Sequence, residues 1–215
     1  MNQTARKLLA LLMKGPQLQK DLPRLLKVKR PTIKYHVDRL EEEGLIIKKI
    51  IAHAGAIKIV QLELDKLALP LIRKILQLPS NKRTLISGFT YDPRIQDKET
   101  LKLPDISRRL LEKEGNKLDK LVCFTTPLAM QERERAGLPL IDRYISYPFE
   151  TYQDPSFADI AKRELAEELT HAEIIIDITP LTKIYTITML QIAHLYHLPV
   201  IYIARNQSTC KLIHF

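Results

Sequence analysis

Residues 30–45 read RPTIKYHVDRLEEEGL. Pro31 suits the first turn of a helix, because its missing N–H would have no partner there, and Gly44 is a good residue to end one. The apolar side chains between them recur at helical spacing: Ile33, Val37 and Leu40. The stretch therefore predicts a helix to about Glu43 with one apolar face.

The residues on either side of this helix predict a small three-helix unit with a hairpin. Apolar side chains at helical spacing predict helices at residues 5–13 and 18–26, and β-rich segments around Gly55 predict strands at 45–52 and 57–64. The order helix, helix, turn, helix, hairpin is typical of a winged helix-turn-helix.

A further amphipathic helix is predicted at residues 65–78, and Pro79-Ser80-Asn81 breaks the chain after it. The sequence thus predicts three parts: a winged helix-turn-helix at 1–64, a linker or dimerisation helix at 65–83, and a second domain at 84–215.

The second domain alternates strands with helices. The expected strands cover residues 84–90, 120–125, 143–147, 173–178, 200–204 and 211–215, and the expected helices cover 105–114, 128–136, 155–169 and 181–196. This alternation predicts a parallel, Rossmann-like α/β sheet with helices on both faces. The fold class is therefore α/β, with an N-terminal winged helix-turn-helix.

The net charge of +9 is confined to one part of the chain. Residues 1–79 hold 16 Lys and Arg against 7 Asp and Glu, and the remaining residues hold equal numbers of each sign. A basic excess confined to one segment favours a polyanionic partner there. Double-stranded DNA is the partner that this charge and the predicted fold indicate together.

Several other classes of protein and site are not supported. No apolar run is long enough to cross a membrane, and the N-terminus has no signal-peptide pattern. Cys123 and Cys210 lack the spacing of a zinc site, so no metal and no cofactor are expected, and a reducing cytoplasm is the expected location. Arg133-x-Arg135 reads as a solvated helix face, because acids flank it.

The DNA contacts are expected on the outer faces of the 30–43 helix, in the turn before it and on the hairpin. The candidates are Lys29, Arg30, Thr32, Lys34, Tyr35, His36, Arg39, Lys48, Lys49 and Lys58. A winged helix used only for protein contacts is the alternative, but the basic excess coincides with the recognition face.

Residues 30–46 resemble the third helix and wing of ArsR- and MarR-like winged-helix regulators. Those families carry a Thr-hydrophobic-x-x-His run, matched from Thr32 to His36, and then Leu-Glu-x-x-Gly-Leu, matched from Leu40 to Leu45. The resemblance covers about residues 4–64 and implies a DNA-binding regulator.

In the second domain, ligands are expected beyond the carboxyl ends of the parallel strands. Hydroxyls and one lysine are expected to meet there, near the start of a helix, where free N–H groups favour an anion. The candidates are Ser87, Gly88, Thr125, Thr126, Thr179, Thr182 and Lys183. Local capping is the alternative role for each hydroxyl. The glycine-rich loops of dinucleotide and nucleoside triphosphate sites are absent from the sequence.

The same segment is similar to the CARF domain, the CRISPR-associated Rossmann fold, whose motif is Asp-x-Thr-Gly-Gly-Thr-Lys. Asp177, Thr179, Thr182 and Lys183 match it, whereas Pro180 and Leu181 replace the two glycines. The resemblance covers about residues 84–215. It implies a homodimer that binds a cyclic oligoadenylate, a nucleotide second messenger, across its two-fold axis.

Three hypotheses follow. The first is a transcriptional regulator in CRISPR-associated antiviral defence, in which the ligand changes the spacing of two recognition helices through the 65–78 helix. The second is a ring nuclease that cleaves its ligand without a metal, with Ser87 and Lys183 as its candidate catalytic residues and no evident general base. The third is a DNA-binding module whose α/β domain only dimerises.

Overall fold

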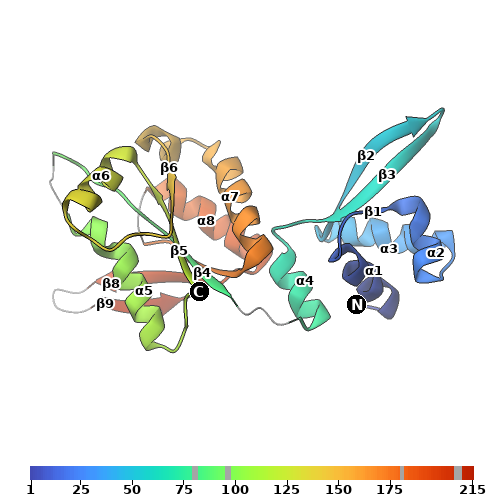
Figure 1. Cartoon of the computed structure of the whole chain (residues 1–215), viewed down its shortest axis with the longest axis horizontal. Coiled ribbons are helices and arrows are strands. Elements are labelled where there is room, and N and C mark those ends of the chain that lie inside the picture. Colours follow the sequence, from blue (N-terminus) through green and yellow to red (C-terminus); the bar gives the residue numbers. More distant parts are fainter. Residues whose placement is uncertain (79–81, 95–97, 180–181, 206–209) are drawn as a thin grey trace. The chain divides into compact units, whose positions relative to one another are not determined.

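The computed structural model describes residues 1–78, 82–94, 98–179, 182–205 and 210–215. The chain divides into two units, Met1–Pro79 and Ser80–Phe215 (Figure 1). The boundary falls within the Pro79-Ser80-Asn81 segment, which lies outside the described residues.

The first unit has the element order of a winged helix-turn-helix, as predicted. Its helices are α1 (Gln3–Leu12), α2 (Leu22–Leu26), α3 (Arg30–Glu42) and α4 (Leu69–Leu76), and its strands are β1 (Gln17–Leu18), β2 (Ile46–Ala54) and β3 (Ile57–Leu64). The strands form one antiparallel sheet in the order β1-β3-β2. Strands β2 and β3 are the hairpin, or wing, that follows α3 (Figure 1).

The prediction of one continuous helix at residues 18–26 is wrong. Gln17 and Leu18 pair with Leu62 and Gln61 of β3, and a short 3₁₀ turn, η1 (Gln19–Asp21), precedes α2. The apolar spacing of this stretch fits a helix, but pairing with a strand more than 40 residues away holds its first part extended.

Helix α3 ends at Glu42, and Gly44 is the residue that stops it, as the sequence predicted. Gly44 has a φ of +66°, which a residue without a Cβ adopts at little cost. Its N–H donates to the carbonyl of Glu41, and the N–H of Leu45 donates to that of Leu40. These two bonds form a Schellman motif, which turns the chain from α3 into the wing.

Helix α4 starts four residues later than the predicted 65–78 helix. The carboxylate of Asp65 accepts a hydrogen bond from the N–H of Leu67 at 2.9 Å, which makes a turn before the helix. Ala68 and Ile72 are buried in the same core as Leu8 and Leu9 of α1. This segment therefore packs into the first unit.

The second unit has a six-stranded sheet in the order β6-β5-β4-β7-β8-β9. Its strands are β4 (Arg83–Phe89), β5 (Lys120–Thr125), β6 (Arg143–Ser146), β7 (Glu173–Asp177), β8 (Val200–Arg205) and β9 (Cys210–His214). All neighbouring pairs are parallel except β8 and β9. This order places the topological switch point between β4 and β7.

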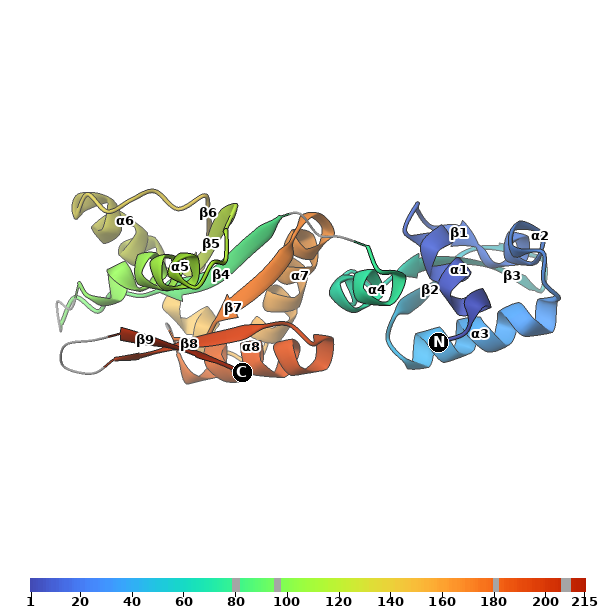
Figure 2. The same ribbon diagram turned by 90° about the horizontal axis from the view of Figure 1, so that it is seen from below.

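Helices cover both faces of this sheet (Figure 2). The helices are α5 (Leu103–Lys113), α6 (Pro127–Arg135), α7 (Phe157–His171) and α8 (Lys183–Tyr196). Leu85 and Cys123 of the strands pack in one core with Leu111 of α5. Phe124, next along β5, instead contacts Phe157 of α7 and Tyr185 of α8. The alternation of side chains along β5 thus separates two cores, one on each face.

Candidate nucleic-acid interface and ligand site

Helix α3 presents most of its predicted DNA-reading side chains to solvent. Thr32, Lys34, Tyr35 and Arg39 are exposed, and Ile33, Val37 and Leu40 are buried beneath them. Lys29 and Arg30, at the start of the helix, are exposed as well. The outer face of α3 and its first turn are therefore available to a partner.

The predicted place of His36 on the outer face is wrong. His36 is 5% exposed, and its Nε2 lies 3.1 Å from Nδ2 of Asn2. It stands three residues after Ile33 and four before Leu40, so helical geometry puts it on the buried face. The histidine holds α3 against the N-terminus of α1 in the structure.

Three of the predicted DNA-binding cations already have carboxylate partners. Lys48 contacts Asp38 and Glu41, each at 2.6 Å, Lys49 contacts Glu63, and Arg39 contacts Glu43 at 2.8 Å. Burial lowers the pKa of Lys48, but the two carboxylates outweigh it and raise that pKa overall. These ion pairs reduce the charge that these side chains offer to DNA.

The remaining cations are concentrated at the start of α3 and on β3. Lys29, Arg30 and Lys58 are exposed, and no ion pair to them occurs within the described residues. Lys34 is also exposed. The hydrogen bond from Lys48 lowers the pKa of Asp38, and the charge of Lys34, one turn away, adds to this effect. Arg30, Lys34 and Lys58 line one groove between α3 and β3.

At the switch point of the second unit lies a buried carboxylate, Asp177. It accepts hydrogen bonds from the hydroxyls of Ser87 at 2.9 Å and Ser107 at 2.5 Å, and from the N–H of Thr179 at 2.9 Å. Burial raises the pKa of Asp177, and these hydrogen bonds oppose that rise. The carboxylate thereby joins β4, α5 and the end of β7.

The hydroxyls predicted to meet a ligand all have partners inside the unit. Thr125 donates to the carbonyl of Phe89, Thr126 accepts from the N–H of Ala129, and Thr179 accepts from that of Ile203. Thr182 accepts from the N–H of Tyr185 at the start of α8 and donates to the carbonyl of Tyr152 at 2.5 Å. Thr126 and Thr182 thus have the capping role that is the alternative to ligand binding, whereas the bonds of Thr125 and Thr179 join different strands of the sheet.

The other ligand-site candidates differ in exposure. Ser87 and Gly88 are buried within β4, so the Ser87 side chain does not reach the surface. Lys183 is exposed at the first residue of α8. Pro180 and Leu181, which replace the two glycines of the motif, lie outside the described residues.

Two polar residues of this region were missed by sequence reasoning. Ser107 lies inside α5, where no motif marks it, and Tyr185 lies two residues after the Asp177–Lys183 motif. The Tyr185 hydroxyl is 3.4 Å from the carbonyl of Asp177 and 3.5 Å from that of Ser87. Burial raises the pKa of Tyr185 far above its usual range, so it stays a neutral donor.

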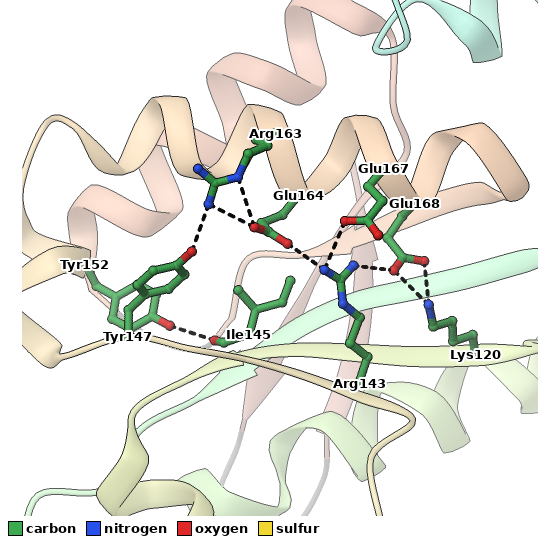
Figure 3. A network of polar contacts seen from close by, with 9 residues as sticks. All are labelled: Lys120, Arg143, Ile145, Tyr147, Tyr152, Arg163, Glu164, Glu167 and Glu168. Carbon is green, nitrogen blue, oxygen red and sulfur yellow. Dashed lines mark hydrogen bonds and ion pairs between the residues drawn. The ribbon is translucent and has the colours of Figure 1, made fainter.

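A larger polar network connects β5 and β6 to α7 (Figure 3). Arg143 contacts Glu164 at 2.7 Å, Glu167 at 3.1 Å and Glu168 at 2.8 Å. Lys120 contacts Glu168 at 2.8 Å. Arg163 also contacts Glu164, at 3.0 Å, so three cations face three carboxylates. The network therefore holds α7 to the sheet and offers no excess charge to a ligand.

Arg133 does not lie on a solvated helix face, as its sequence neighbours had suggested. It is 1% exposed, and its guanidinium contacts Asp105 at 2.9 Å. The acid that pairs with it comes from α5, not from its own helix.

The described residues hold no group of three or more His, Cys, Asp or Glu side chains placed to bind a metal ion. None of the helices in the described ranges has the length and apolar character that crossing a bilayer requires.

Comparison with solved structures finds partial similarities of the fold. They include Csm6 from Enterococcus italicus bound to cyclic hexa-2′-fluoro-hexa-dAMP. The two chains are 16% identical in sequence, the match covers 58% of this chain and 34% of Csm6, and the TM-score is 0.42. Can2 from Sulfobacillus thermosulfidooxidans in complex with cyclic tetra-adenylate is 16% identical. That match covers 57% of this chain and 32% of Can2, with a TM-score of 0.36. A ZitR mutant from Lactococcus lactis is 15% identical. That match covers 54% of this chain and 66% of ZitR, with a TM-score of 0.30. The chain thus covers less than two thirds of each of these proteins.

At the level of sequence, no curated protein matches the chain. Residues 2–48, which run from the cap of α1 into the wing, match the model of the arsR family of bacterial regulatory proteins. The first unit of this chain is therefore a winged helix-turn-helix with the sequence pattern of ArsR-family regulators.

Proposed function

We propose that this protein is a transcriptional regulator that binds operator DNA through its first unit and senses a cyclic oligoadenylate through its second. The first unit supplies the recognition helix and the cations for DNA. The second supplies a switch point at which an anionic nucleotide is bound, and its occupancy changes the affinity for DNA. Two copies of the chain act together, because a recognition helix then meets each half-site of the operator.

The single observation that carries the DNA-binding role is the outer face of α3. Thr32, Lys34 and Tyr35 are exposed near the start of the helix, where recognition helices contact base edges. Lys29 and Arg30 add exposed cations at the same end. Phosphate contacts supply affinity and base contacts supply specificity, so this surface offers both.

The ligand role is supported by the resemblance of the second unit to the CARF domain. Asp177, Thr179, Thr182 and Lys183 carry it, together with the position of β7 at the switch point. Lys183 is the exposed cation of this set, so we assign it the contact with a ligand phosphate.

The DNA-binding role is tested by selecting bound duplexes from a random pool and measuring the affinity of the full chain for the enriched sequence. Lys29→Gln is expected to weaken binding and to reduce the slope of log affinity against log salt by about 1, because Lys29 is an exposed cation at the start of α3. Lys74→Gln is the matched control, since Lys74 is exposed on α4 and is not among the predicted DNA-binding residues. Failure of the wild-type chain to bind any duplex at low salt would refute the role.

The ligand role is tested by calorimetry with cyclic tetra-adenylate and cyclic hexa-adenylate. One of them is expected to bind, and Lys183→Ala is expected to weaken binding at least about tenfold, since it removes a charge-assisted contact. Lys162→Ala is the control, because Lys162 is exposed on α7 and carries the same charge. Absence of binding by both ligands contradicts the sensor role, and linear products would indicate the ring nuclease instead.

A further inference from the structure

Each of the three hydrogen-bond donors that surround the Asp177 carboxyl group is neutral. They are the hydroxyls of Ser87 and Ser107 and the N–H of Thr179, and the carboxyl group itself is fully buried. Burying a carboxylate is costly unless hydrogen bonds replace the water that it loses. Each of these donors therefore affects where the carboxyl group lies.

Ser107 provides the shortest of the three bonds, and it is the one donor that comes from a helix packed on the sheet. Its Oγ lies 2.5 Å from Oδ2 of Asp177, and the side chain is fully buried. The same oxygen lies 3.0 Å from the carbonyl of Leu103, one turn earlier in α5. A hydroxyl has one proton to donate, and the shorter contact with a carboxylate is the stronger of the two. Ser107 thus connects Asp177 to the first half of α5.

The other carboxyl oxygen of Asp177 holds the chain that follows β7. Oδ1 accepts from the N–H of Thr179 at 2.9 Å, and the Thr179 hydroxyl accepts in turn from the N–H of Ile203 at 2.7 Å. Thr182 caps α8, whose first residue is Lys183. Side-chain hydrogen bonds therefore hold both ends of the segment between β7 and α8, and the bond at its β7 end depends on Asp177.

We infer that Ser107 is a positioning residue for the ligand site of the second unit. Through its hydrogen bond to Asp177 it holds the segment that carries Lys183, and it thereby sets the affinity for an anionic nucleotide. Ser107 contacts no ligand itself, because its hydroxyl is buried against Asp177. It lies 70 residues before this aspartate, outside the Asp177–Lys183 motif. The inference depends on the proposed function, in which Lys183 contacts a ligand phosphate.

The effect of losing the Ser107 hydroxyl follows from this geometry. Oδ2 of Asp177 would keep a single donor, the Ser87 hydroxyl at 2.9 Å. A buried acceptor that lacks a donor is costly, so the carboxyl group is expected to turn or shift toward its remaining donors. Such a movement weakens the bond from the N–H of Thr179 and is expected to displace Lys183. A displacement of about 1 Å is enough to weaken a preorganised polar contact.

The test measures the affinity of the full chain for cyclic tetra-adenylate and cyclic hexa-adenylate by calorimetry. Ser107→Ala is expected to weaken binding of the ligand that the wild type binds by about fivefold, because Asp177 loses one hydrogen bond. Ser107→Thr keeps a hydroxyl at the same place in the helix and is expected to restore the affinity to within about twofold of the wild type. Urea unfolding establishes that each variant is folded.

Thr84→Val is the matched control for the loss of a buried hydroxyl. Thr84 is 2% exposed and pairs with Ile174 near the amino ends of β4 and β7, whereas Asp177 lies at the carboxyl end of β7. This variant is expected to bind the ligand like the wild type, whatever stability it loses.

A double-substitution cycle tests whether Ser107 acts through Lys183. In a chain that already carries Lys183→Ala, Ser107→Ala is expected to weaken binding by less than about twofold, because the contact that Ser107 positions is gone. A purely structural role would reduce the affinity by the same factor in both backgrounds.

Three results overturn the inference. They are wild-type affinity in Ser107→Ala, a folded Ser107→Thr that binds no better than Ser107→Ala, and equal factors in the two backgrounds of the cycle. All three leave the proposed function in place. A wild-type chain that binds neither ligand overturns the sensor role and the inference together.

Discussion

Arg133 is a charged residue at the centre of a buried contact in the second unit. Its guanidinium contacts Asp105 at 2.9 Å and the carbonyl of Pro139 at 2.7 Å, and it also contacts the carbonyl of Leu101. It lies 5.4 Å from the ring centre of Phe89. Its Nε has no hydrogen-bond partner among the described residues. One side chain thus connects α6 with the end of β4 and the start of α5.

Replacing this arginine is expected to cost far more stability than replacing its neighbour on the same helix. Arg133→Met leaves Asp105 without its partner and frees two carbonyls, which is expected to lower the free energy of unfolding by about 3 kcal/mol. Arg135→Met is the control, because the Arg135 side chain is 70% exposed in its pair with Glu132. Its expected cost is below about 0.5 kcal/mol. Urea unfolding measures both, and equal losses would contradict the role of Arg133.

At the scale of elements, the sequence predicted best those whose pattern is local. The strands at 57–64 and 120–125 agree with the structure residue for residue. Continuous apolar runs and glycine turns mark such strands without help from distant residues. The ends of most helices of the second unit lie within about two residues of their predicted positions, the usual scatter of helix boundaries.

Most of the failures have distant partners, although the burial of His36 follows from its local helical spacing. Gln17 and Leu18 are held by β3, and Arg133 is paired with an acid 28 residues away in the sequence. The Ser87–Asp177 hydrogen bond joins residues 90 apart. No pattern within one segment contains such a partner. This is why the candidate residues of both sites were named from their sequence, while their burial and bonding were not predicted.

The network between α7 and the sheet makes the second unit sensitive to acid (Figure 3). Burial by itself raises the pKa of Glu168, but hydrogen bonds from Lys120 and Arg143 outweigh it, and the pKa is lowered overall. The unfolded chain therefore binds the proton more readily than the folded one. The stability that Glu168 contributes is present above its unfolded pKa and is lost as the pH falls through its folded pKa.

Glu168→Gln is expected to lower the free energy of unfolding at pH 7 by about 1 to 2 kcal/mol, because it weakens two charge-assisted hydrogen bonds. Below pH 4.5, the ordinary pKa of this carboxyl, the loss of stability with falling pH is expected to be shallower than in the wild type. Urea unfolding at a series of pH values measures both effects. Glu167→Gln is the control, since that side chain is 64% exposed. A wild-type acid response in Glu168→Gln would disprove the linkage.

At the scale of the whole molecule, the two units differ in charge and in what they offer a partner. The first carries the whole net charge of +9 and exposes cations on α3 and in the groove. The second has equal numbers of basic and acidic side chains and buries its central carboxylate, Asp177. In the proposed function, DNA and a nucleotide bind at separate surfaces, and a regulator must connect them energetically.

If the second unit regulates the first, the connection works equally in both directions. If a cyclic oligoadenylate changes the affinity of the protein for DNA by a given factor, DNA must change the affinity for the oligoadenylate by the same factor. Such factors are typically about 5- to 150-fold. Calorimetry with and without duplex gives one factor, and DNA titrations with and without ligand give the other. Lys29→Gln is expected to weaken DNA binding while keeping this factor, because it acts only at the DNA surface. Unequal factors mean that the ligand is not at equilibrium, as it would be if the protein cleaved it. If both factors equal one, DNA and the ligand bind independently, and regulation by this ligand is excluded.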